Sequence, residues 1–224
     1  MRNLFIILIL LIAGAGLFAG GSSESEGPGR PTEEVPGSPQ PGSPSPATGG
    51  APATGSATGP VAGERSIDSE TRQLLEESRI RVFRERVDSI PFTLKNPQGE
   101  DVSLADYQGS ALLLNFWATW CPPCIEELPS MIRLEEELRD SNFAMLAVSL
   151  REEPELVSSF LEEHGFDLPV ALDISGQVGM EYGVRGIPTS YVIDQQGKVL
   201  GVLVGAREWD DPEVIALFEH LGGE

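Results

Sequence analysis

Residues 111–124 read ALLLNFWATWCPPC, and this stretch decides how the rest of the chain is interpreted. Residues 111–117 form an almost wholly apolar run without Gly or Pro, which is typical of a strand buried on both faces. A long helical pattern then runs to about residue 139. Cys121 therefore lies where a buried strand meets a helix, and Cys124 lies within the first helical turn. Unpaired backbone N–H groups and the positive end of the helix dipole stabilise a thiolate at this place.

The chain has only two cysteines, so any site built from them is a pair. Two thiolates alone cannot form a four-ligand zinc or iron–sulfur site, and His164 and His220 are isolated in the sequence. A structural bridge between residues three apart constrains little of the unfolded chain. A peroxidase is disfavoured because one C-x-x-C pair accounts for both cysteines. Thiol–disulfide exchange is favoured, and a copper carrier that recruits His164 or Met180 stays open.

Residues 115–124, NFWATWCPPC, resemble the active-site segment of TlpA/ResA-like extracytoplasmic thiol–disulfide oxidoreductases of the thioredoxin superfamily. The resemblance extends from about residue 91 to 204 and includes Gly186-Ile187-Pro188-Thr189 ahead of a predicted strand. It implies an α/β thioredoxin-like fold, in which helices flank a mixed central β-sheet. It also implies a cis peptide bond before Pro188, with the backbone around Ile187 and Pro188 placed to pair with a client chain.

The same resemblance suggests a role for Glu127. Thioredoxin itself has a buried Asp where this chain has Asn115, which cannot accept a proton, whereas TlpA/ResA-like proteins have a Glu three residues after the second cysteine. Glu127 is therefore expected one helical turn beyond Cys124, where it would take that thiol's proton. The alternative is a solvated glutamate on the helix surface. Trp120 is expected to border Cys121 as an apolar platform for a client peptide.

These residues together predict a disulfide reductase. Cys121 attacks the client's disulfide, and Cys124 resolves the mixed disulfide with help from Glu127. The exchange is reversible, so an oxidase or isomerase remains an alternative. The resemblance implies a reductant that is recharged by a membrane thiol–disulfide transporter and acts on disulfide-containing exported proteins such as apocytochromes c. No cofactor and no metal are expected.

The N-terminal segment predicts export. Residues 1–21 begin with a positive charge and continue with an unbroken apolar run, as in a signal peptide or membrane anchor. The apolar stretch over residues 4–18 is shorter than the ~20 residues that span a bilayer, which favours a cleaved signal. Residues 22–63 are rich in Pro, Gly, Ser and Thr, which predicts a disordered linker. Both interpretations place the rest of the chain outside the cytoplasm, in the periplasm or at the outer face of the inner membrane.

The net charge of −20 disfavours binding to nucleic acids and to anionic lipid, so membrane contact is expected only through a possible N-terminal anchor. The acidic excess is expected to form a solvated surface, or to favour a basic client. Residues 64–89 are rich in charge, with apolar residues near helical spacing, and predict one amphipathic helix. Residues 90–224 form the predicted thioredoxin-like domain. Its other predicted elements are strands at 92–95, 143–150, 170–172, 190–194 and 199–204, and helices at 154–164, 177–182 and 212–221.

Overall fold

A computed structural model describes residues 65–223. The predicted signal or anchor at residues 1–21 and the predicted linker at residues 22–63 lie outside the described residues. Within the described part, no helix is both long enough and apolar enough to cross a bilayer.

The strand β4 (Ala111–Trp117) lies inside an eight-stranded mixed sheet, and every one of its residues is buried. It pairs in parallel with β5 (Phe143–Leu150) and antiparallel with β7 (Thr189–Ile193). Its two neighbours pair with both edges of β4, and apolar clusters from the helices cover both faces of the sheet, which explains its apolar run. The strand order is β1-β8-β7-β4-β5-β6-β2-β3. The remaining strands are β1 (Arg81–Asp88), β2 (Thr93–Lys95), β3 (Asp101–Ser103), β6 (Val170–Asp173) and β8 (Lys198–Val204).

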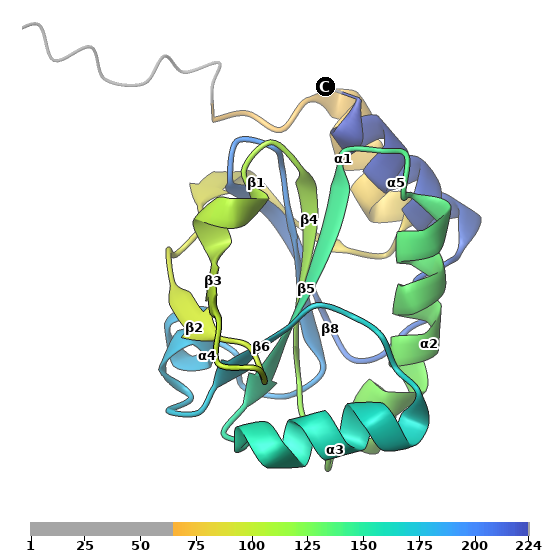
Figure 1. The fold of residues 1–224 in the computed structure, drawn as a ribbon. Helices are drawn as coiled ribbons and strands as arrows, with labels where there is room; N and C mark the ends of the chain where they lie inside the picture. The colour runs from red at the N-terminus through yellow and green to blue at the C-terminus, as the bar shows by residue number, and fades with distance from the viewer. Residues whose placement is uncertain (1–64, 224) are drawn as a thin grey trace, which may run out of the picture. The chain divides into compact units, whose positions relative to one another are not determined.

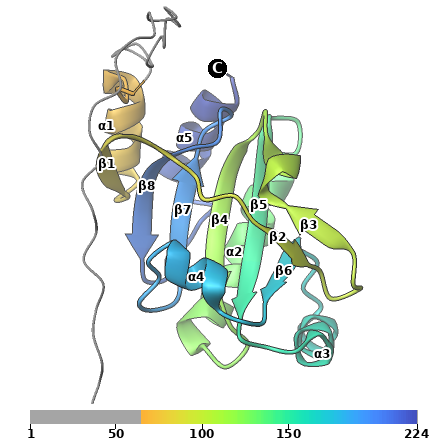
Figure 2. The ribbon, with the colours of Figure 1, turned by 90° about the vertical axis from the view of Figure 1, so that its left-hand side faces the viewer.

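Helices cover both faces of this sheet (Figures 1 and 2), as expected for the predicted thioredoxin-like fold. One apolar cluster joins the sheet to α1, α2, α3 and α5, through residues such as Leu75, Leu128, Val157 and Leu217. A second cluster joins the opposite face to α4 and to the short 3-10 helix η1. The bounds are α1 (Ser69–Glu77), η1 (Leu104–Tyr107), α2 (Pro122–Glu137), α3 (Pro154–His164), α4 (Gln177–Glu181) and α5 (Pro212–Gly222).

The structure confirms the predicted elements from residue 92 onward to within two residues, although β3 and η1 were not predicted. The helix α3 shows why its ends were predictable. It begins with Pro154, whose missing N–H is not needed in the first turn. It ends at His164, and Gly165 after it has a φ of 66°, which lets the last carbonyl groups find backbone donors.

The single amphipathic helix predicted over residues 64–89 is wrong, because its second half is the strand β1. The helix α1 ends where Arg79 takes a left-handed φ of 55°. The chain then turns back and pairs antiparallel with β8, whose other edge would otherwise be open. Val82 and Phe83 suit that pairing, since β-branched and aromatic side chains fit a half-buried pleated surface.

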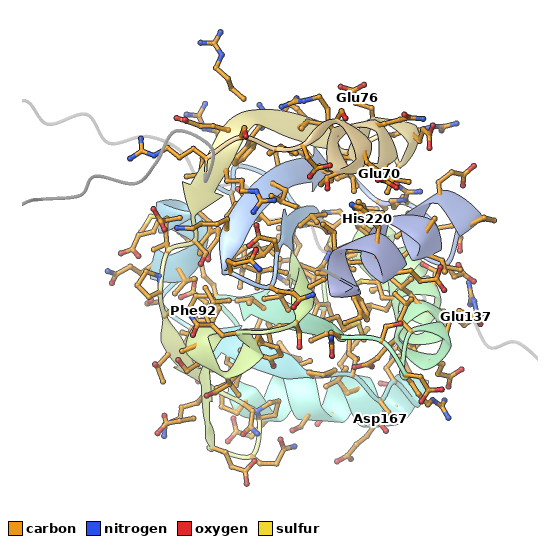
Figure 3. All side chains as sticks on the ribbon, turned by 90° about the horizontal axis from the view of Figure 1, so that it is seen from above. Glu70, Glu76, Phe92, Glu137, Asp167 and His220 are labelled. Atoms are coloured by element: carbon orange, nitrogen blue, oxygen red, sulfur yellow. A yellow bond between two sulfur atoms is a disulfide. The ribbon has the colours of Figure 1, made fainter. Side chains whose placement is uncertain are left out.

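The helix α1 packs against the C-terminal helix α5. Its Leu75 is fully buried in the core, and Thr71 Oγ1 lies 3.0 Å from His220 Nε2 in a hydrogen bond. Figure 3 shows His220 beside Glu70, and Nδ1 of His220 lies 3.9 Å from a carboxylate oxygen of Glu70. The first described helix is therefore joined to the last one.

Candidate active site

The two cysteines lie where the sequence predicts, at the junction of β4 and α2. Cys121 is the N-cap residue of α2, and Pro122 and Pro123 occupy its first two positions. The backbone N–H groups of Cys124 and Ile125 donate to the carbonyl oxygen of Cys121, which closes the first turn. The two cysteines form a disulfide with their Cα atoms 5.3 Å apart. The positive end of the α2 dipole therefore acts on both sulfurs.

The two sulfurs differ in their access to solvent. Cys121 is 4% exposed in the disulfide form, whereas Cys124 is fully buried. Trp120, directly before Cys121, is 67% exposed, while Trp117 at the end of β4 is fully buried. An exposed indole costs free energy unless something covers it, so Trp120 offers an apolar surface beside the outer sulfur.

The structure brings the Pro188 segment to the same end of the sheet. The peptide bond between Ile187 and Pro188 is cis, as the resemblance implies. Thr189, the next residue, pairs with Phe116 near the end of β4. The carbonyl oxygen of Pro188 accepts a bond of 2.9 Å from the N–H of Gly205, which ties the segment to the end of β8. Ile187 and Trp120 line one groove, so two of the predicted client-binding residues lie together.

Glu127 is buried inside a polar network, and the alternative of a solvated surface glutamate is wrong. Only 2% of this residue is exposed, and it lies on the same buried side of α2 as Cys124. One carboxylate oxygen accepts a bond of 2.8 Å from Asn115 Nδ2, and the other accepts 3.2 Å bonds from the indole of Trp209 and the N–H of Arg207. Burial raises the pKa of Glu127 to about 7, although all three of these hydrogen bonds lower it.

The arrangement matches known redox proteins. The sequence profile of the AhpC/TSA family matches residues 88–202, about half of the chain. The chain belongs to this family. ResA of Geobacillus thermodenitrificans, named a thiol–disulfide oxidoreductase, is 37% identical over 120 residues, which cover 54% of this chain and 69% of that protein. The chain is therefore a ResA-like thiol–disulfide oxidoreductase.

Solved structures of similar proteins agree with this assignment. A putative thiol:disulfide interchange protein DsbE from Chlorobium tepidum is 34% identical, with a TM-score of 0.55, over 59% of this chain and 96% of that one. StoA from Bacillus subtilis is 26% identical, with a TM-score of 0.50, over 57% of this chain and 96% of that one.

Two residues that support Glu127 in this oxidoreductase were not predicted from the sequence. Trp209 is fully buried, and its backbone N–H donates 2.9 Å to Ser130 Oγ while its indole reaches Glu127. The guanidinium of Arg207 lies over the Trp209 ring, 5.4 Å from its centroid, and donates to the carbonyl oxygen of Ser78 at the end of α1. The carboxyl of Glu127 is thereby connected to the N-terminal α1 segment. Eighty or more residues of sequence separate these groups, so no local spacing signals the contact.

Glu152 is a second residue that the sequence analysis missed. It follows β5 in the sequence, and it is only 4% exposed. Its carboxylate accepts bonds from the N–H and the hydroxyl of Thr119, at 3.0 Å and 2.5 Å, and from the hydroxyl of Ser149 at 2.7 Å. Glu152 therefore fixes the turn that leads from β4 into the cysteine pair.

The two further ligands considered for a copper site lie apart from each other. The ring of His164 on α3 stacks on Phe160, with 4.2 Å between their centroids. Met180 on α4 lines the groove that Trp120 borders. Over residues 65–223, no three His, Cys, Asp or Glu side chains converge as a metal-binding group would.

Proposed function

We propose that this chain is an extracytoplasmic protein-disulfide reductase that acts on exported proteins through the Cys121–Cys124 couple. The observation that carries the proposal is the burial of Glu127 one helical turn beyond the fully buried Cys124. A carboxyl whose pKa burial raises to about 7 exchanges its proton readily at neutral pH. Cys121, at the more exposed end of the pair, is left to meet the client.

The proposed reaction begins with the reduced protein. The Cys121 thiolate attacks one sulfur of a client disulfide, the client's S–S bond breaks, and the second client sulfur leaves as a thiolate that takes up a proton. Cys124 then loses its proton to the Glu127 carboxylate and attacks the Cys121 sulfur. The mixed disulfide breaks, and the first client sulfur leaves as a thiolate that takes up the proton which Glu127 releases. The client gains two electrons and two protons, and the protein keeps the Cys121–Cys124 disulfide.

The proposed client site lies beside the outer sulfur. Trp120 supplies an exposed apolar face, and Ile187 lines the same groove. The backbone around cis-Pro188, at the same end of the sheet, is proposed to pair with an extended client chain. Backbone pairing would accept many sequences, which suits an enzyme with several clients.

The proposed location rests on the sequence of residues 1–21, whose pattern is that of a signal peptide or anchor. Outside the cytoplasm the Cys121–Cys124 disulfide must be reduced again after each turnover. We assign that step to a membrane thiol–disulfide transporter, with apocytochromes c and other exported thiol proteins as clients. A reductase of this kind needs a reduction potential near that of thioredoxin, about −270 mV, whereas a value near −120 mV would indicate an oxidase.

The experiment is the reduction of insulin disulfides by the reduced protein. We expect the wild-type protein to reduce insulin and the Cys121→Ser variant to be inactive. Binding of one Cu(I) per chain without any disulfide exchange would overturn the proposal in favour of a copper carrier. The reduction potential of the couple, measured against glutathione in the same preparation, then tests the direction of the reaction.

A further inference from the structure

The groove beside the cysteine pair carries two arginines. Its volume is about 270 Å³, and Trp120, Met180 and Ile187 form much of its apolar lining. Trp120 is 67% exposed and Met180 is 61% exposed. Arg151 and Arg185 also line the groove, and no Asp or Glu does.

This composition contrasts with the rest of the domain. Residues 90–224 contain 24 acidic and only 7 basic side chains. Four of the five basic residues outside the groove form ion pairs with Asp or Glu. Arg151 and Arg185 have no ion pair and no side-chain hydrogen bond within the described part of the chain. Both guanidinium groups of the groove are therefore available for a carboxylate from a partner.

The place of Arg151 in the groove depends on its backbone conformation and on the space left by Gly176. Arg151 has a φ of 60°, a conformation that costs a non-glycine residue about 1 kcal/mol and that tends to persist where function requires it. Its N–H donates 2.9 Å to the carbonyl oxygen of Asp173, which holds the turn. Its side chain lies across Gly176, where an added Cβ would come within 2.4 Å of Nε. The absence of a side chain at Gly176 therefore makes room for this arginine in the groove.

We propose that this groove binds a client segment that carries acidic and apolar residues beside its cysteine. This inference rests on the proposed reductase function and names the class of client. Trp120 and Met180 would cover the apolar side chains, and the two guanidinium groups would bind the carboxylates, for which their planar donors are well suited. Acidic groups farther than about 8 Å from the groove act weakly on a bound client, because charges at that distance are screened at physiological ionic strength.

The test uses two synthetic peptides, each closed by one internal disulfide with a Leu next to a cysteine. The peptides differ only in the residues flanking their cysteines, which are Glu in one and Lys in the other. The rate constant for oxidation of the reduced protein by each peptide is measured. Each exposed Arg–carboxylate contact changes such a rate by about twofold to fivefold. We therefore expect the Glu peptide to react about tenfold faster.

Variants of the two arginines test whether they cause the faster reaction of the Glu peptide. The double variant Arg151→Ala with Arg185→Ala should bring the ratio of the two rate constants to one or below. The double variant with Lys at both positions should keep part of the preference. Arg139→Ala is the matched control, because Arg139 is an exposed arginine that follows the other end of α2, and its ratio should equal the wild-type ratio.

Three outcomes would overturn the inference. A wild-type ratio of one or less, or a ratio that the double alanine variant leaves unchanged, rejects the acidic client while the reductase function stands. The third outcome is a reduced protein that reacts with neither peptide and also fails to react with the neutral bis(2-hydroxyethyl) disulfide. That result would reject the proposed function and the inference together.

Discussion

The two sides of the cysteine pair differ in polarity and in access. On the outer side, Cys121 lies beside the exposed Trp120 and a groove whose arginines have no partner within the described residues. On the inner side, Cys124 is fully buried above a hydrogen-bonded carboxyl, that of Glu127. One helix N-terminus thus offers one sulfur to partners and keeps the other near a proton acceptor. Changes on the outer side should alter the choice of client, and changes on the inner side should alter proton transfer.

The largest effect is expected from substitution of the cysteines, and it should differ between Cys121 and Cys124. Cys124→Ser removes the thiol that resolves the mixed disulfide, so a covalent complex between Cys121 and the client should accumulate. Non-reducing electrophoresis and mass spectrometry of the variant mixed with oxidised insulin measure this complex. Cys121→Ser should give none. A complex that forms with Cys121→Ser instead would reverse the assignment of the two sides.

The next effect concerns the inner side alone. Glu127→Gln keeps the size of the side chain but removes the proton acceptor, so insulin reduction should slow by about 100-fold, the lower range for general acid–base catalysis. Rate measurements across pH should also show that the variant loses a transition near pH 7. The fold should survive, because the buried Oδ1 of Asn115 has no partner among the described residues and can accept from the new amide.

The control for this variant is Glu126→Gln. Glu126 is the exposed neighbour on the same helix, so the same chemical change there should leave the rate and its pH profile as in the wild type. Equal rates for Glu127→Gln and Glu126→Gln would remove Glu127 from the mechanism.

The buried carboxyl also predicts how stability depends on pH. Burial raises the pKa of Glu127 from 4.5 to about 7, so the folded protein binds this proton more tightly than the unfolded chain does. Its contribution to the free energy of unfolding is therefore present below pH 4.5 and is lost as the pH rises to about 7. The loss is about 3 kcal/mol at most. Denaturant unfolding of the oxidised protein should show this decline, and Glu127→Gln should flatten it.

A smaller effect, on stability, is expected when Glu152 no longer holds the turn that leads from β4 into the cysteine pair. Glu152→Ala leaves three donors of Thr119 and Ser149 without their acceptor, which should lower the free energy of unfolding by about 2 kcal/mol. Thermal unfolding measures the change. Glu153→Ala is the matched control, because Glu153 is exposed and its side chain makes no capping hydrogen bond. Equal melting temperatures for the two variants would show that Glu152 does not stabilise this turn.

Much of the outer side could be predicted from local sequence. The apolar run of β4 and the prolines after Cys121 determine a strand, a turn and a helix start within a few residues. The position of Cys124 in the first turn follows from spacing alone. The cis bond before Pro188 was predicted only through the resemblance, since a proline at a strand start is common at sheet edges.

The inner side depends on contacts between distant residues. The carboxylate of Glu127 accepts hydrogen bonds from Trp209 and Arg207, which lie some 80 positions later in the sequence. Glu152 reaches Thr119 from the end of a different strand. The prediction for the residues of β1 was wrong for the same reason. Their charge-rich sequence suits a surface helix, and only the pairing with the edge of β8 shows that they form a strand.

The central claim is that the two thiols of the reduced protein differ in reactivity. Mass spectrometry after brief treatment with iodoacetamide near neutral pH measures this directly, residue by residue. We expect Cys121 to be alkylated first, below the pH at which an ordinary thiol ionises, and Cys124 to react only after unfolding. Two thiols that both remain unmodified in the folded, reduced protein would contradict the account.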